Sequence, residues 1–398
     1  MLVKRAYKFR LYPTAEQERV LARQFGASRF VYNHFLRARI DYYLANKDGA
    51  KKGLTYHDTA LMLTQLKQQP EYEWLKEANA QALQQALRDL DTAYRNFFDH
   101  RARFPRFKRK HDRQSFRVPQ GFRVQDNRLV IPKVSPIKMV IHRPIEGTMK
   151  HVTVSRTKTG HYYASILCEV EMPEPEYQGG EIGIDLGLKS FLATSEGETV
   201  DSPKYLRKAE RRLKRLQRRL SRRKKGSKGR EKTRRQLARQ HEKVANQRSD
   251  FLHKLSRRLV DENQAIHAES LNVRGMLANH RLAKSIADSG WGEFVRQLSY
   301  KGEWYGCRLV QIDRFFPSSR RCAACGFINQ GLRLSDREWA CPACGVIHDR
   351  DHNAAVNILL VGRATAGAAE SYAGGEGVRR FSEAPPRRSR KLPVRNGE

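Results

Sequence analysis

The spacing of apolar residues in the first hundred positions predicts one strand followed by helices. Apolar and charged residues alternate from Val3 to Leu11, which is typical of a β-strand. Thr14 then begins a helix, and Gln17 three residues later completes a capping box. Apolar residues recur at helical spacing as far as a break at residues 49–53 and again in two later segments, 56–67 and 78–98. These segments predict a small helical bundle.

Residues 122–171 have a different pattern, with short alternating runs separated by Gly and Pro. This pattern predicts an antiparallel sheet or a small barrel. The strand at residues 3–11 has no partner nearby in the sequence, so we expect it to join this barrel, with the helical bundle as an insertion.

An α/β pattern follows the Pro-rich segment PEPEYQGG. Two paired strands are expected at 182–186 and 191–195, then a helical hairpin over 204–258 with leucines at heptad-like spacing. We then expect a buried strand at 265–270, a helix at 291–305, a further strand at 308–312 and a short helix at 351–360. The segment from Arg363 is poor in large apolar residues, which predicts disorder. The fold class is therefore multidomain, α+β and then α/β.

The charge of the chain indicates a polyanionic partner. Its 398 residues carry 77 Lys and Arg against 42 Asp and Glu, a formal charge of +35, and residues 204–258 supply +20 of it. Nucleic acid is the first candidate. No apolar run is long enough for a membrane span, and the N-terminus lacks the apolar segment of a signal peptide. We expect the protein to stay inside the cell.

Residues 101–116, RARFPRFKRKHDRQSF, interleave cations with phenylalanines. This pattern is typical of a groove that pairs phosphates with cations and stacks bases on rings. A solvated linker whose phenylalanines tuck into a neighbouring core explains it equally well, so the sequence leaves both interpretations open.

Four of the six cysteines form two C-x-x-C pairs, Cys322 with Cys325 and Cys341 with Cys344. This spacing predicts a ribbon at about 317–347 in which four thiolates bind one Zn²⁺. Glycine directly follows each pair and suits the turn there. With four protein ligands the zinc has no open position, so we expect it to be structural. The two single cysteines, Cys168 and Cys307, are expected to be small buried side chains.

Three carboxylates are candidates for a catalytic site. Asp185 lies within the apolar strand of GIDLG, Glu269 within that of AIHAESL, and Asp351 opens the helix of DRDHNAAVNIL. Their order along the chain is that of RNase H-like nucleases, in which central strands and a crossing helix bring three carboxylates together. Such oxygen ligands suit Mg²⁺ or Mn²⁺ for phosphodiester cleavage.

Asp349 competes with Asp351 for the third position. If Asp351 starts the helix, then Ala354, Ala355 and Ile358 share its face, and the small residues among them allow close approach to the sheet. We therefore choose Asp351 and expect His348, Asp349 and Asn353 to act in support or capping.

Together these motifs resemble the TnpB (OrfB) family, the accessory nucleases of bacterial insertion sequences and relatives of type V CRISPR effectors. The resemblance rests on FRLYPTAEQ, GIDLG, SRRKKGS, AESLNVRGM, GWGEF, the four cysteines and DRDHNAAVNI, and it extends to about residue 362. It implies a cytoplasmic, nucleoid-associated bacterial nuclease guided by an RNA from the end of the element. Its target is double-stranded DNA beside a short flanking motif.

The resemblance also implies a domain arrangement. It consists of a wedge β-barrel at 1–13 and 114–178, a helical recognition bundle at 14–113, a split RuvC-like nuclease domain at 179–316 and 348–362, the zinc ribbon at 317–347 and a disordered tail at 363–398. Asp185, Glu269 and Asp351 are then the catalytic metal ligands. We expect nucleic acid to contact polar residues of the bundle, basic residues of the hairpin and one residue near the nuclease site: Tyr56, Gln81, Gln84, Arg222, Arg223, Lys224, Lys225 and Arg350.

Two other functions use the same features. A transposase performing strand transfer also employs an RNase H-like acidic triad, although this chain shows no separate domain for binding transposon ends. A non-catalytic nucleic-acid-binding regulator would need only the charge and the ribbon, and the intact triad argues against it.

Overall fold

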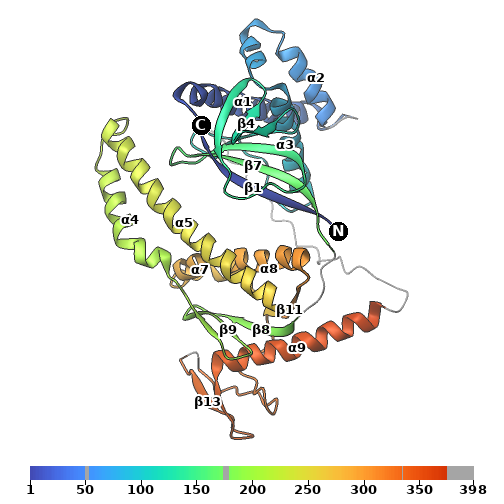
Figure 1. Cartoon of the computed structure of the whole chain (residues 1–398), viewed down its shortest axis with the longest axis vertical. Helices are drawn as coiled ribbons and strands as arrows, with labels where there is room; N and C mark the ends of the chain where they lie inside the picture. The colour runs from blue at the N-terminus through green and yellow to red at the C-terminus, as the bar shows by residue number, and fades with distance from the viewer. Residues whose placement is uncertain (50–52, 174–178, 334, 374–398) are drawn as a thin grey trace. The chain divides into compact units, whose positions relative to one another are not determined.

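The computed structural model describes residues 1–49, 53–173, 179–333 and 335–373. The chain forms two compact units (Figure 1). The first comprises Met1–Glu176 and Lys204–Phe251, and the second comprises Tyr177–Pro203 and Leu252–Glu398. The basic hairpin thus clusters with the N-terminal sheet and helices, whereas the domain boundaries expected from the sequence remain a prediction.

The first unit is built on a seven-stranded sheet in the order β2-β6-β7-β1-β5-β4-β3. The predicted placement of the first strand is confirmed, because β1 pairs antiparallel with both β7 and β5. The strands are β1 Leu2–Tyr12, β2 Gln114–Val118, β3 Arg123–Gln125, β4 Arg128–Ile131, β5 Val134–Val140, β6 Thr148–Arg156 and β7 Tyr162–Glu171.

The sequence predicted an antiparallel sheet or a small barrel, and the structure has an antiparallel sheet in the form of an open half-barrel. Among the described residues no pairing joins its edge strands, β2 and β3. Helix α1, Ala15–Asn46, packs on β2 and β5, and Phe25 contacts Phe116 at 5.3 Å between ring centroids. Because a helix covers this part of the apolar face, closure of the sheet is not needed to bury it.

The helical bundle contains α1, α2 (Tyr56–Leu66), the 3₁₀ helix η1 (Pro70–Glu77) and α3 (Ala80–Phe98). The predicted capping box at Thr14 is present, with the Gln17 amide donating to the threonine hydroxyl and the threonine amide donating to the glutamine side chain. The bundle core is formed by buried apolar residues, among them Val31, Phe35, Leu63, Leu83 and Leu87.

The basic hairpin consists of α4, Tyr205–Ser221, and α5, Lys228–Glu262, and the division between the units falls within α5. The predicted narrow apolar seam is confirmed by the burial of Leu213, Leu216 and Val244. His161 Nδ1 lies 3.3 Å from Glu242 Oε2, which links α5 to the turn before β7.

The second unit holds a five-stranded sheet in the order β10-β9-β8-β11-β12. Strand β8 pairs parallel with β11 and antiparallel with β9, and β11 pairs parallel with β12. The strands are β8 Gly180–Leu186, β9 Ser190–Thr194, β10 Thr199–Asp201, β11 Asn263–Glu269 and β12 Arg308–Ile312. Helices α6 Val273–Met276, α7 Ala283–Ser289 and α8 Trp291–Tyr305 lie between β11 and β12 in the sequence.

The last helix, α9, runs from Arg350 to Ala373 and packs against β8, β11 and β12 (Figure 1). The expectation that the helix ends near residue 360 and that disorder begins at Arg363 is therefore wrong as far as Ala373. The alanine-rich sequence RATAGAAESYA explains the error, because alanine favours helix even where few large apolar residues are available. The rest of the expected tail, residues 374–398, lies outside the described residues.

The structure supports the linker interpretation of segment 101–116 at one phenylalanine, and the interpretation as a nucleic-acid groove stays a prediction. Phe116 is buried in the core, whereas Phe104 and Phe107 remain 47% and 41% exposed. Cys168 and Cys307 are buried as expected. None of the helices in the described part of the chain has the length and apolar character that a membrane span requires.

Candidate functional site

The three candidate carboxylates come from adjoining elements of the second unit. Asp185 lies near the end of β8 and Glu269 at the end of β11, and these strands run parallel with Ile184 opposite Ala268. Because neighbouring parallel strands end at the same edge of a sheet, the two side chains lie at one edge. Asp351 stands at the beginning of α9, which packs on both strands.

Gly183 allows α9 to cross β8 closely. A Cβ added at Gly183 would lie 2.1 Å from the carbonyl oxygen of Ala355, so the helix backbone occupies the space of a side chain. Ala354, Ala355 and Ile358 are buried on this face, as the sequence predicted. Asp349 ends β14, Ile347–Asp349, and its Oδ1 accepts a hydrogen bond from the His352 amide at 2.8 Å. This is a capping role, which leaves Asp351 on the helix itself.

Like charges and burial perturb the site. The pKa of Asp185 is raised to about 7, first by burial and then by the charges of Glu269 and Asp351, while Arg350 opposes the shift. Burial also raises the pKa of Glu269, and a hydrogen bond from Ser318 opposes it. Repulsion of the Asp185 carboxylate by Glu269 and Asp351 favours the binding of a cation beside Asp185.

Two residues near the carboxylates escaped the sequence analysis. Ser318 Oγ donates to Glu269 Oε1 at 2.6 Å, and Arg337 Nη1 lies 3.5 Å from Asp351 Oδ1. Both residues lie in the 317–347 region. Ser318 is far in sequence from Glu269, and the second cysteine pair separates Arg337 from Asp351. No spacing rule connects a ribbon arginine to a helix carboxylate, so the sequence carries no signal for this ion pair.

The four cysteines form a compact potential metal site. Their sulfurs all lie within 4.8 Å of one another, and within the described residues no other group of three or more Cys, His, Asp or Glu meets this spacing. The three carboxylates are therefore less tightly grouped than the thiols. Gly326 and Gly345 have φ of 81° and 72°, and their amides donate to the carbonyls of Cys322 and Cys341 at 2.9 and 2.8 Å. The donor set and the knuckle turns fit a tetrahedral zinc ion.

Two asparagines of α9 fasten the first cysteine knuckle to the helix. Asn353 Nδ2 donates to the carbonyl of Arg321 at 2.7 Å, and its Oδ1 accepts from the Ala323 amide at 2.9 Å. Asn357 Nδ2 donates to the carbonyls of Arg321 and Ser318 at 2.6 and 2.9 Å. The supporting role expected for Asn353 is confirmed. Asn357 was missed, although its i+4 spacing from Asn353 within an apolar stretch was a usable signal.

The three bundle residues expected at nucleic acid have different surroundings. The Tyr56 ring lies under the Arg88 guanidinium at 5.3 Å, and Gln81 Oε1 accepts from the Gln120 amide at 3.2 Å. Gln84 is exposed. The structure thus engages Tyr56 and Gln81 in contacts within the protein and leaves Gln84 open to a partner.

The expected basic contacts also differ from one another. Arg222, Lys224 and Lys225 are exposed at the hairpin turn, whereas Arg223 donates to the carbonyl of Gly229 and so helps to shape the turn. Arg350 donates to the carbonyl of Arg333 at 2.8 Å and lies 3.4 Å from the Ser319 hydroxyl. Arg350 therefore ties α9 to the ribbon in addition to its electrostatic effect on Asp185.

These features define a basic, multidomain α+β protein with a four-cysteine module next to an acidic cluster. Three family models match it: OrfB_IS605, "Probable transposase", at residues 165–280, "Cas12f1-like, TNB domain" at 291–358, and the "Helix-turn-helix domain" of OrfB_IS605 at 1–48. The chain belongs to the TnpB (OrfB) family.

Relatives from two bacteria match nearly the whole chain. A protein of Streptomyces pristinaespiralis named "Putative RNA-guided DNA endonuclease" is 42% identical over 95% of this chain and 92% of its own length. InsQ of Escherichia coli strain K12, which carries the same description, is 34% identical over 93% of this chain and 95% of its own length.

The fold is also similar to that of a protein chain in a solved complex. The protein chain in the "Cryo-EM structure of the Cas12f1-sgRNA-target DNA complex" is matched with a TM-score of 0.55 at 13% identity, over 90% of this chain and 98% of that chain. At this identity the likeness concerns the fold alone.

Proposed function

We propose that the chain is an RNA-guided DNA endonuclease associated with a transposable element, and that it cleaves phosphodiester bonds at Asp185, Glu269 and Asp351. The observation that carries the proposal is the convergence of these carboxylates at the ends of β8 and β11 and the start of α9. The names of the full-length relatives support the choice of substrate and guide.

The proposed site suits Mg²⁺ or Mn²⁺. Its donors are hard carboxylate oxygens, and the repulsion that raises the pKa of Asp185 would be relieved by a divalent cation. A bound Mg²⁺ would polarise the phosphoryl group and make water a stronger nucleophile. Ser318 orients the Glu269 carboxylate through its hydrogen bond. Arg337 balances the charge of Asp351, and its guanidinium can also contact a phosphate beside the metal ion.

We assign the four cysteines to a structural zinc ion. Its proposed effect on catalysis follows from α9, which carries Asp351 and holds the first knuckle through Asn353 and Asn357. A disturbed knuckle would shift Ser318 and α9 together. Zinc would thereby stabilise the acidic site without taking part in the reaction.

We place the guide RNA and the target DNA along the basic surfaces of the first unit. The exposed Arg222, Lys224 and Lys225 supply phosphate contacts, and Gln84 of the bundle is a candidate contact for the flanking DNA. Pairing of the guide with the target would supply most of the sequence specificity.

The proposal is tested by cleavage of a plasmid library with a randomised flank. The protein is purified together with RNA transcribed from the region that overlaps and follows its gene, and is incubated with Mg²⁺. We expect guide-dependent cutting beside one short flank, and loss of cutting in Asp185→Ala. Asp201→Ala, which removes an exposed carboxylate from β10 of the same sheet, should retain it. If the Asp185→Ala variant still cleaves the target, the proposal is wrong.

The same reaction mixture distinguishes the two alternatives. A joined donor and target product that forms without guide RNA would identify a strand-transfer transposase. Binding without cleavage under every guide and divalent ion would identify a non-catalytic regulator.

A further inference from the structure

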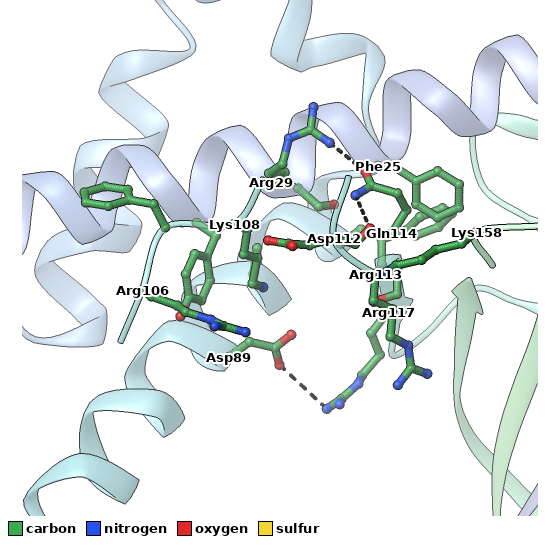
Figure 2. A pocket seen from close by; sticks show the side chains of 17 residues that line it. Phe25, Arg29, Asp89, Arg106, Lys108, Asp112, Arg113, Gln114, Arg117 and Lys158 are labelled. Carbon is green, nitrogen blue, oxygen red and sulfur yellow. Dashed lines mark hydrogen bonds and ion pairs between the residues drawn. The ribbon is translucent and has the colours of Figure 1, made fainter. Parts of the chain in front are cut away.

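A cleft of about 540 Å³ opens in the first unit between α1, α3 and the segment that leads into β2 (Figure 2). It is lined by six cationic side chains and two carboxylates: Arg29, Arg106, Lys108, Arg113, Arg117, Lys158, Asp89 and Asp112. Positive charge therefore exceeds negative charge on its walls, and none of these residues belongs to the acidic site or the ribbon.

The two carboxylates are already engaged within the protein. Asp89 Oδ1 lies 3.9 Å from Arg117 Nη1, and Asp112 Oδ2 accepts from the Arg109 amide at 2.8 Å. By contrast, Arg106, Arg113 and Lys158 have no ion pair within the part of the chain that the structure describes. Three cations thus remain available to an anion that enters the cleft.

Hydrogen bonds hold the segment that supplies these cations. Asn33 brackets the backbone of Lys108, donating to its carbonyl at 2.9 Å and accepting from its amide at 2.8 Å. Arg29 donates to Gln114 Oε1 at 2.6 Å, and Gln114 Nε2 donates to the carbonyl of Asp112 at 3.0 Å (Figure 2). The cleft is therefore organised before any ligand arrives, which reduces the entropic cost of binding.

Lys108 occupies an unusual position for a lysine. Its ammonium nitrogen lies 3.7 Å from the centroid of the Tyr32 ring, within cation–π range. The residue is exposed, so an anion in the cleft can reach its ammonium group. Desolvation by the surrounding protein lowers the pKa of Lys108, and the charge of Asp89 opposes the shift.

We propose that this cleft binds a phosphodiester of the nucleic-acid backbone, with Lys108 and Arg106 as its principal contacts. Phe107, which also lines the cleft and is 41% exposed, offers an apolar surface for the adjoining nucleotide. The choice of nucleic acid as the polyanion rests on the proposed function, whereas the anion site itself rests on the cleft.

The test measures binding of a short fluorescent single-stranded oligonucleotide by anisotropy across a range of salt concentrations. The full chain carries Asp185→Asn and no Mg²⁺ is added, so a failure of cleavage cannot affect the result. We expect Lys108→Gln and Arg106→Gln each to weaken binding about tenfold and to reduce the slope of log K against log salt by about 0.7. Lys110→Gln and Arg103→Gln, which alter the same segment outside the cleft, should change affinity by less than about twofold.

A second measurement protects the test from misfolding of the Lys108 variant. Amine-reactive footprinting of the otherwise unaltered protein should show that the oligonucleotide shields Lys108 and leaves Lys110 reactive. An oligonucleotide with neutral methylphosphonate linkages should bind the Lys108 and Lys110 variants equally. The proposal is overturned if cleft and control variants lose affinity equally, if Lys108 is not shielded, or if the neutral oligonucleotide shows the same loss.

Inorganic phosphate separates a backbone site from a site for the free ion. At matched ionic strength it should displace the oligonucleotide no better than chloride. Specific displacement by phosphate that disappears in Lys108→Gln would show that the cleft takes the free anion, against the proposal.

Discussion

Substitution of Gly183 by alanine tests whether the close crossing of α9 over β8 sets the geometry of the acidic site. The added Cβ would lie 2.1 Å from Ala355 O and 2.9 Å from the Leu359 amide nitrogen, well inside an ordinary 3.4 Å contact. Both obstacles are helix backbone, so neither can rotate away. We expect α9 to be displaced by roughly 1 Å, at a cost of about 1–3 kcal/mol in folding free energy.

The consequence for cleavage should be larger than the consequence for stability. Asp351 lies on the same helix one turn before Ala355, whereas Asp185 lies two residues beyond Gly183 on the strand. A displacement of α9 therefore separates two of the proposed metal ligands. A misplacement of about 1 Å lowers turnover by about 10²-fold. The cost in folding free energy corresponds to a fall in Tm of about 2–12 °C for a unit of this size.

Differential scanning fluorimetry and single-turnover cleavage with the guide complex would measure both effects. Gly180→Ala is a matched control, because it adds the same methyl group to the same strand where nothing lies within 4 Å. It should leave both quantities near their original values. If Gly183→Ala retains full cleavage, or if the two variants lose stability equally, the close crossing does not position the carboxylates.

Further predictions concern the ribbon and the charges at the site. Cys341→Ala should abolish cleavage and lower Tm together, because the cysteine cluster is joined to α9; full activity would show that the ribbon is only an appendage. Arg337→Gln should slow cleavage about tenfold with little change in Tm, since its ion pair with Asp351 is partly exposed; unchanged single-turnover rates would count against a role for it. A carboxyl group whose pKa is higher in the folded protein than in the unfolded chain stabilises the folded protein at pH values below its unfolded pKa of 3.8. For Asp185 this contribution is lost as the pH rises to about 7. In Mg²⁺-free buffer Asp185→Asn should therefore raise Tm at pH 8 and lose that advantage towards pH 4, and a constant difference across this range would contradict the assigned cause.

Local signals in the sequence predicted most of the elements. The capping box at Thr14, the heptad leucines of the hairpin and the alternation in β7 each depend on neighbours within one or two turns. The assignment of Asp351 over Asp349 followed from helical periodicity, and Asp349 does cap the helix. The catalytic roles themselves stay a prediction, since position alone does not establish chemistry.

Such local signals do not predict contacts between residues that lie far apart in the sequence. Ser318 meets Glu269, and Arg337 meets Asp351, only because the ribbon folds back onto α9. Helix α1 packs on β2 and β5 of the first sheet, and no strand pattern encodes this packing. The cleft around Lys108 likewise combines four segments, although the basic and aromatic pattern of 101–116 indicated its chemistry.

The asparagines of α9 give the two proposed metal sites a reciprocal dependence. If zinc, by ordering the first knuckle, increases the affinity of the acidic triad for Mg²⁺, then Mg²⁺ must increase the affinity of the cysteines for zinc by the same factor. Release of zinc to a chelator would then slow as Mg²⁺ is added. Scarcity of either ion in the cell would lower the affinity of the protein for the other ion. Nuclease activity would therefore depend on the concentrations of both metals together.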